Sequence, residues 1–232
     1  MVRTDLTQPT RLWVSRFSPA TGQWSTTFQI PHTSIQPPAL AAFDNRLHLI
    51  GVTPGTKQLW SATMTTDEVF TPSSLLSGQF SASRVSATLF ACKLYIAHRA
   101  GTTTEVVYNS FDGAQWTYDQ TIPAGPGGAS LLAAEPAIAE RSGFLHLVHR
   151  DNAPISGVPI WWTYFDGNSW ASEVTLGQAS TFYPPSLTAG GPGLVAIATT
   201  YYDSLASSLL YTQPLPRFPR FCLAPPTAEL TP

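Results

Sequence analysis

Two pairs of neighbouring polar side chains are the residues of this sequence best suited to ligand chemistry. His98 precedes Arg99, and His149 precedes Arg150 one repeat later. An imidazole and a guanidinium together offer several hydrogen-bond donors, and the guanidinium presents its donors in a planar fork. Donors at matching places along a chain can bind the hydroxyl groups of a ligand. They can equally satisfy neighbouring carbonyl groups, and both interpretations stay open at the level of sequence.

Three further residues join these candidates. Trp161 and Trp162 are adjacent, so on a regular strand they point to opposite faces. Trp162 continues an apolar pattern, which leaves Trp161 as an exposed platform for stacking. Tyr202 and Asp203 form an aromatic and polar pair on a predicted loop. The predicted ligand-binding set is His98, Arg99, His149, Arg150, Trp161, Tyr202 and Asp203.

The sequence predicts no catalytic residue, metal site or cofactor. It contains no GxSxG, phosphate-loop or dinucleotide-binding motif. Carboxylates do not recur in pairs at related positions. Cys92 and Cys222 belong to no CxxC motif or Cys/His cluster, so we expect two buried or idle thiols and no zinc site. A binding protein is therefore favoured over an enzyme.

The elements that must position these side chains repeat along the chain. The segment PALAAFDNRLHLIG begins at Pro38 and recurs three times with the same skeleton, at a period of about 49 residues. A second alternating segment follows each copy. It places aromatic residues at Trp60, Tyr108, Trp162 and Tyr211. Short alternating runs separated by Asp-Gly or Pro-Gly turns predict strands.

Units of this length with three or four short strands are typical of β-propeller blades. We expect an all-β propeller of four or five blades, formed as a single domain over residues 1–232. Pairing of the N- and C-terminal strands would close the ring and remove exposed sheet edges. The predicted units are 11–37 (partial), 38–84, 85–134, 135–183 and 184–218, with a proline-rich tail over 219–232.

The repeated unit resembles the tandem repeats of β-propeller lectins from fungi and bacteria, such as the tectonin-like and Photorhabdus-type lectins. It is similar, more distantly, to sialidase-like repeat proteins. The resemblance spans Arg11 to Phe218 and rests on the repeat pattern. Sialidase-like propellers carry Asp boxes, from which SFDGAQW and YFDGNSW depart in spacing. We therefore interpret Asp112-Gly113 and Asp166-Gly167 as tight turns.

Composition agrees with a sugar-binding function. The chain has 12 basic and 14 acidic residues, and charged residues make up only 11%. This balance gives no basic face for nucleic acid, whereas a neutral, hydroxyl-rich surface suits hydroxylated ligands. We expect a multivalent lectin that binds neutral sugars of glycans or glycoproteins through aromatic stacking and hydrogen bonds. The alternatives are a glycoside hydrolase or lyase of sialidase-like type and a protein-interaction scaffold.

Two expectations concern location and assembly. The apolar runs are shorter than a membrane span, and the N-terminus lacks the pattern of a secretory signal. We expect no membrane insertion and a protein that is cytoplasmic or released without a signal peptide. Incomplete end units that complete each other between chains would form a homodimer.

Overall fold

The chain is all β in a computed structural model that describes residues 1–4, 10–64, 69–101, 103, 105–123, 133–151, 159–180, 184–190, 194–200 and 207–211. These residues form twenty strands, β1 to β20, and no helix. Within them, no helix is long and apolar enough to cross a membrane. The predicted all-β class is confirmed.

Three four-stranded antiparallel sheets correspond to the three complete repeats. Sheet II contains β6 (Ala39–Phe43), β7 (Arg46–Val52), β8 (Gln58–Met64) and β9 (Ser74–Phe80). Sheet III contains β10 (Ser86–Phe90), β11 (Lys93–Arg99), β12 (Val106–Phe111) and β13 (Gln120–Thr121). Sheet IV contains β14 (Ala133–Arg141), β15 (Phe144–Asp151), β16 (Pro159–Phe165) and β17 (Val174–Ser180).

A three-stranded sheet lies at each end of this series. Sheet I contains β1 (Val2–Thr4), β2 (Arg11–Val14) and β5 (Phe28–Thr33), and a hairpin of β3 (Phe17–Ser18) and β4 (Gln23–Trp24) connects the last two. Sheet V contains β18 (Ser186–Gly190), β19 (Leu194–Thr200) and β20 (Ser207–Tyr211). Every sheet joins strands that are close in sequence.

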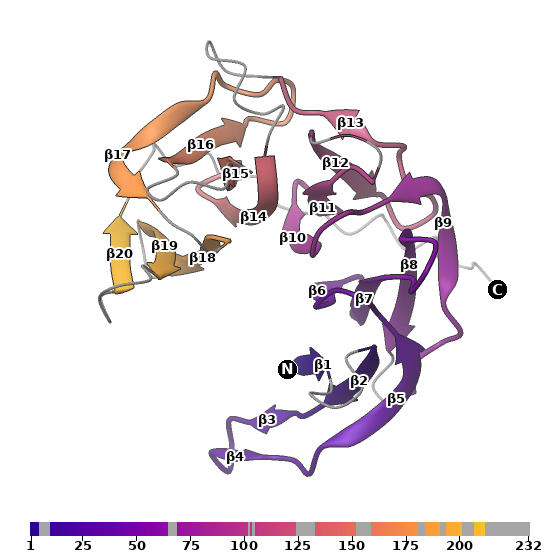
Figure 1. Cartoon of the computed structure of the whole chain (residues 1–232). Helices are drawn as coiled ribbons and strands as arrows, with labels where there is room; N and C mark the ends of the chain where they lie inside the picture. The colour runs from indigo at the N-terminus through magenta and orange to yellow at the C-terminus, as the bar shows by residue number, and fades with distance from the viewer. Residues whose placement is uncertain are drawn as a thin grey trace, which may run out of the picture.

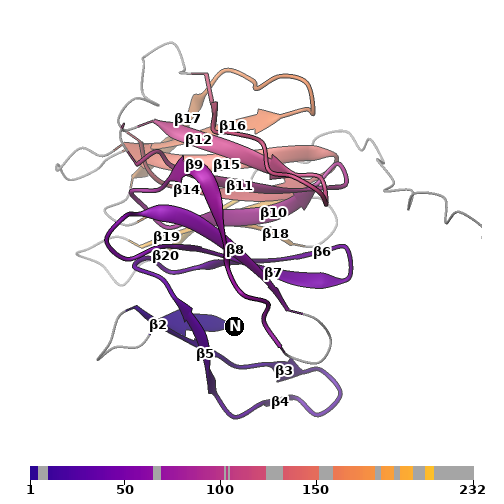
Figure 2. The same cartoon turned by 90° about the vertical axis from the view of Figure 1, so that its right-hand side faces the viewer.

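The sheets follow one another in an arc in chain order (Figure 1). The first strands of sheets II to V contact one another in succession, β6 with β10, β10 with β14 and β14 with β18. Figure 2 shows sheets I to IV layered face against face. Sheets I and V are not joined in the described residues (Figure 1). Ring closure and the number of blades therefore stay predictions.

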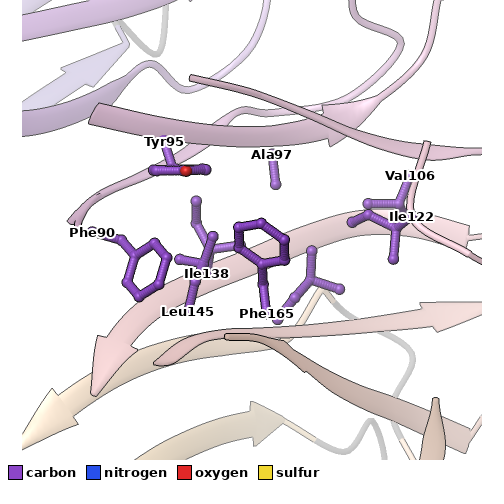
Figure 3. Packing of buried hydrophobic residues seen from close by; sticks show 9 residues of the cluster. Phe90, Tyr95, Ala97, Val106, Ile122, Ile138, Leu145 and Phe165 are labelled. Carbon is purple, nitrogen blue, oxygen red and sulfur yellow. The ribbon is translucent and has the colours of Figure 1, made fainter. Parts of the chain in front are cut away.

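The hydrophobic core is divided among the interfaces between successive sheets. In the interface between sheets III and IV, Phe90 and Tyr95 of sheet III pack against Leu145 and Phe165 of sheet IV (Figure 3). Similar clusters lie between the other neighbouring sheets. The second strands of sheets II to IV are thus buried on both faces, which explains their nearly continuous apolar sequences. Each fully buried large apolar side chain contributes about 1.5–3 kcal/mol.

The strand register corrects the alignment of aromatic residues expected from the sequence. Gly51 and His149 occupy the same place on the second strands of their sheets, counted from the preceding two-residue turns. Trp60 lies opposite Gly51, and Trp161 lies opposite His149, whereas Trp162 is one position further along. Trp161 is therefore the equivalent of Trp60. A sequence period cannot choose between two adjacent tryptophans, but the hydrogen-bond ladder does.

The interpretation of the Asp-Gly sequences as tight turns is confirmed. The Asp112 carboxylate accepts hydrogen bonds from the backbone N–H groups of Ala114 and Gln115, both at 2.9 Å. The bonds from Gln115 and Ala114 lower the pKa of Asp112 below its usual value. Asp166 closes the equivalent turn of sheet IV in the same way. These carboxylates serve the fold.

The expectation of idle thiols is wrong for Cys92. This residue is disulfide-bonded, and it follows Ala91 in the tight turn between β10 and β11, where both residues have positive φ angles. The second cysteine of the sequence, Cys222, lies outside the described residues.

Candidate functional site

The strongest candidate site lies between sheets III and IV, at the ends of their second strands. Tyr95 and Ala97 of β11 belong to the apolar cluster of this interface. Side chains alternate along a strand, so Arg99 points to the same side, towards sheet IV. Arg99 is the last residue of β11 and is partly exposed. The guanidinium therefore stands where the interface opens to solvent.

Sheet IV supplies the facing side of this site. Leu145 and Leu147 of β15 belong to the same apolar cluster, and His149 continues their face. Trp161 of β16 is the cross-strand neighbour of His149. Trp161 is partly exposed, as is the adjacent Trp162, and its role as a platform stays a prediction. Arg99 and Trp161 thus face a common space from two sheets.

Both side chains hold a buried donor that has no partner. Arg99 Nε and Trp161 Nε1 are buried atoms without a hydrogen bond inside the protein. Leaving a buried donor unsatisfied costs about 1–3 kcal/mol, and more for a charged group. A ligand would reach these two atoms only after the covering side chains had moved, whereas the exposed parts of the guanidinium and the indole are open to solvent. The site is therefore suited to a ligand that presents oxygen acceptors beside an apolar face.

His149 supports this site from inside the interface. It is fully buried, and its Nε2 lies 2.7 Å from Oε1 of Glu173, which is also fully buried. Its Nδ1 lies 3.4 Å from the backbone oxygen of Arg150. Both ring nitrogens therefore have protein partners. The imidazole has no surface left for a ligand and acts in the packing of sheet IV.

The equivalent histidine of sheet III has the same kind of environment. His98 is fully buried, and its Nε2 lies 3.1 Å from Oδ1 of Asn109 and 3.5 Å from Oδ1 of Asp119. The Asn109 side-chain amide donates to Asp119 at 2.9 Å. Asp119 and Glu173 directly precede the equivalent positions of β13 and β17. A buried histidine with a carboxylate partner is thus a repeated structural feature.

The remaining predicted site residues are not brought together with Arg99. Arg150 shares the face of Val148, which packs towards sheet V, so its side chain belongs to the next interface. Tyr202 and Asp203 lie outside the described residues. Ligand binding through any of the predicted residues stays a prediction.

Sequence reasoning missed an arginine that links three sheets. Arg84 Nη2 donates to the backbone oxygen of Pro185 at 2.7 Å, and its Nε lies 3.5 Å from Oε2 of Glu135. The Arg99 N–H donates to Oγ of Ser83, so this link lies beside the candidate site. Arg84 and Glu135 each stand two residues before the equivalent position of an inner strand. Arg84 and Glu135 occupy the same position in successive repeats, and their opposite charges could have indicated this ion pair from the sequence.

No metal centre adds to this site within the described parts of the chain. Among those residues, no group of three or more His, Cys, Asp or Glu side chains is placed to hold a metal ion. The donors of the site are the guanidinium and the indole. The chemistry that they support is hydrogen bonding and stacking.

The fold of this chain is similar to that of several glycoside hydrolases and a lectin of known structure. No protein-family model matches it, and no curated protein matches it. Among solved structures, a GH43 endo-arabinanase from Bacillus licheniformis aligns with 91% of this chain and 88% of its own length, at a TM-score of 0.55 and 14% identity. A family 117 glycoside hydrolase from Zobellia galactanivorans aligns with 79% of this chain and 68% of its own, at a TM-score of 0.55 and 14% identity.

A fungal lectin belongs to the same group of similar structures. The Aleuria aurantia lectin, in complex with Fucα1-6GlcNAc, aligns with 76% of this chain and 63% of its own length, at a TM-score of 0.51 and 13% identity. That lectin has a six-bladed β-propeller fold. Likeness at these identities concerns the fold. The arc of sheets is therefore of the β-propeller type, and the predicted resemblance to propeller lectins is confirmed at that level.

Proposed function

We propose that the protein binds carbohydrate where the interface between sheets III and IV opens, with Arg99 and Trp161 as the contact residues. The observation that carries this proposal is the pair of partly exposed side chains, Arg99 and Trp161, which point into the same interface from opposite sheets. The neighbouring histidine and glutamate already satisfy each other. The free hydrogen-bonding capacity of the site is therefore that of a donor.

A neutral sugar matches these properties. Its hydroxyl oxygens accept hydrogen bonds, and adjacent hydroxyl groups can share the fork of one guanidinium. The C–H face of the ring can stack on the partly exposed indole of Trp161. The similar structures include a lectin in complex with a fucosylated sugar and a glycoside hydrolase, and both support the same class of ligand. The partners would be glycans or glycoproteins.

We also propose that the sheets close into a five-bladed ring. Alignment of registers places β1, β2 and β5 at the second, third and fourth strand positions, so sheet I lacks an inner strand. Sheet V has the first three positions and lacks an outer strand among the described residues. The two end sheets thus expose opposite vacant edges. Five sheets in one arc favour five blades over four.

The test of sugar binding is a glycan array with four proteins. The unmodified chain is expected to bind at least one glycan. Trp161→Ala and Arg99→Ala are each expected to weaken that binding by about tenfold or more, since each removes a donor. Trp24→Ala is the control, because Trp24 is exposed on the hairpin at the far end of the arc (Figure 1). Absence of any glycan signal, or equal signals from all variants, would contradict the proposal.

A glycoside hydrolase is the second candidate, favoured by the similarity to the GH43 and family 117 enzymes. Glu173 is buried against His149, so the candidate carboxylate is Glu135, whose side chain is 31% exposed and paired with Arg84. Incubation with linear arabinan and an assay for new reducing ends would reveal hydrolysis. Formation of reducing ends that disappears in Glu135→Gln supports the hydrolase. Glycan binding without formation of reducing ends supports the lectin.

A further inference from the structure

We infer that, of the three interfaces joining sheets I to IV, only that between sheets III and IV holds an open sugar site, because the protein's own side chains close the other two. The inference rests on the proposed function. We compare three equivalent residue positions in each interface. The first lies at the end of the second strand of one sheet. The other two form a cross-strand pair on the second and third strands of the next sheet. The site between sheets III and IV fills them with Arg99, His149 and Trp161.

The interface between sheets II and III has apolar residues at two of these positions. Val52 replaces Arg99, and Val107 replaces Trp161. Val52 is fully buried and Val107 is 3% exposed. The buried Gln79 side chain crosses this interface and donates to the backbone oxygen of Thr117 at 3.0 Å. This interface therefore offers a ligand neither a donor nor an aromatic face.

The interface between sheets I and II has the tryptophan but hides it. Trp60 is equivalent to Trp161, yet it is only 3% exposed. A Cβ atom on Gly51 would lie 2.3 Å from Trp60 Cζ2, so the indole rests directly on the glycine backbone. On its other side, the ring centroid of His32 lies 5.2 Å away. The indole is thus enclosed within the core.

The residue opposite the tryptophan explains why one indole is buried and the other is open. In sheet II this residue is Gly51, which leaves room for the ring against the backbone. In sheet IV it is His149, whose imidazole and buried partner Glu173 occupy the equivalent space. Trp161 cannot fold inward there and remains partly exposed. The histidine and glutamate pair thus acts as a positioning element for the sugar platform.

This asymmetry narrows the multivalent binding expected from the repeats. Avidity requires several equivalent sites on one molecule, whereas the interfaces that join sheets I to IV supply a single one. We expect one bound sugar among these three interfaces. The ligand is then a single terminal residue, recognised by one stacking surface and one guanidinium.

The inference is tested by isothermal titration of the full chain with the methyl glycosides of L-fucose, D-galactose, L-arabinose and N-acetylglucosamine. At least one glycoside is expected to bind to the unmodified chain. Trp161→Phe, which keeps a ring but removes the N–H group, is expected to bind about tenfold more weakly. Trp24→Ala is expected to keep both the affinity and the stoichiometry of the unmodified chain.

A second variant tests the positioning role directly. His149→Gly with Glu173→Ser gives sheet IV the residues that sheet II carries at Gly51 and Ser73. Trp161 is then expected to fold against the glycine, as Trp60 does. Tryptophan emission should shift to shorter wavelength, and glycoside binding should be lost while circular dichroism stays that of a β protein. Binding that persists in this variant would refute the positioning role.

The outcomes separate the inference from the proposed function. Full binding by both Trp161→Phe and Arg99→Ala overturns the site between sheets III and IV while leaving sugar binding intact. No binding of any of the four glycosides overturns both. Binding that depends on both Trp161 and Arg99 supports both.

Discussion

All five histidines of the chain lie in the interior of the sheet stack, and each is less than a tenth exposed. His98 and His149 pair with side-chain oxygens. His146 instead accepts a hydrogen bond on Nδ1 from Trp162 Nε1 at 3.2 Å and stacks on that indole. Desolvation lowers the pKa of His146 to about 4. The same cause lowers the pKa values of His32 and His48.

These lowered pKa values predict stability that decreases in mild acid. Between pH 6.5 and about 4, His146 is protonated in the unfolded chain but neutral in the folded one. The free energy of unfolding therefore falls as the pH is lowered through this window, by up to about 1.4 kcal/mol per pH unit for one such group. Urea denaturation at several pH values measures the slope.

A variant assigns that slope to its source. His146→Tyr places at this position the residue that sheet III carries as Tyr95. The dependence on pH should weaken but persist, because His32 and His48 contribute with the same sign. An unchanged slope in this variant would show that His146 is not responsible.

At the scale of elements, the second strand of each sheet determines both the packing and the site. Its side chains alternate between two interfaces. The position of Gly51, His98 and His149 therefore determines which side chains pack between this sheet and the preceding one. Gly51 admits the indole of Trp60, whereas His98 and His149 bring carboxylate partners. Small changes at this position therefore alter the interface more than changes elsewhere on the strand.

The contact between Gly51 and Trp60 predicts a measurable coupling. Gly51→Ala should lower the free energy of unfolding by about 1–3 kcal/mol, because the new methyl group overlaps the six-membered part of the indole. Trp60→Phe removes the overlapping atoms, so the second substitution should cost less in that background. A double-mutant cycle by urea denaturation is expected to show a coupling of about 0.5–3 kcal/mol. Strict additivity would contradict the contact.

The sequence was sufficient to predict the strands of these elements but not their partners. Apolar alternation and turn residues are local signals, so the repeats and the turns at Asp112 and Asp166 could be predicted. The partnership of His149 with Glu173 could not, because it spans 24 residues and depends on the register of β16 against both β15 and β17. The pairing of Trp161 with His149 puts both side chains on the face towards sheet III.

At the scale of the whole molecule, Arg84 connects parts of the chain that are 101 residues apart. It extends from the start of sheet III to Glu135 of sheet IV and to Pro185, which directly precedes β18 of sheet V. The main strand contacts between different sheets, such as β6 with β10 and β14 with β18, join neighbouring sheets. This link therefore helps to hold sheet V in the arc.

Removal of Arg84 is expected to loosen sheet V selectively. In Arg84→Ala, the amides of β18 and β19 should exchange hydrogen faster, whereas those of β7 and β8 in sheet II should keep their protection. Hydrogen exchange followed by mass spectrometry measures both regions in one experiment. Arg46→Ala is the control, because Arg46 is exposed at the turn of sheet II. Equal protection of sheet V in the two variants would contradict this role.

The backbone of Arg99 is held by the segment that arrives from sheet II. Its N–H group donates to Oγ of Ser83 at 3.1 Å, and its carbonyl oxygen accepts from the N–H group of Ala82 at 3.0 Å. A ligand that reaches the guanidinium thus meets a preorganised backbone. The conformational entropy lost on binding is confined to the arginine side chain, about 2 kcal/mol at most. Recognition here would then proceed without an induced rearrangement of the strands.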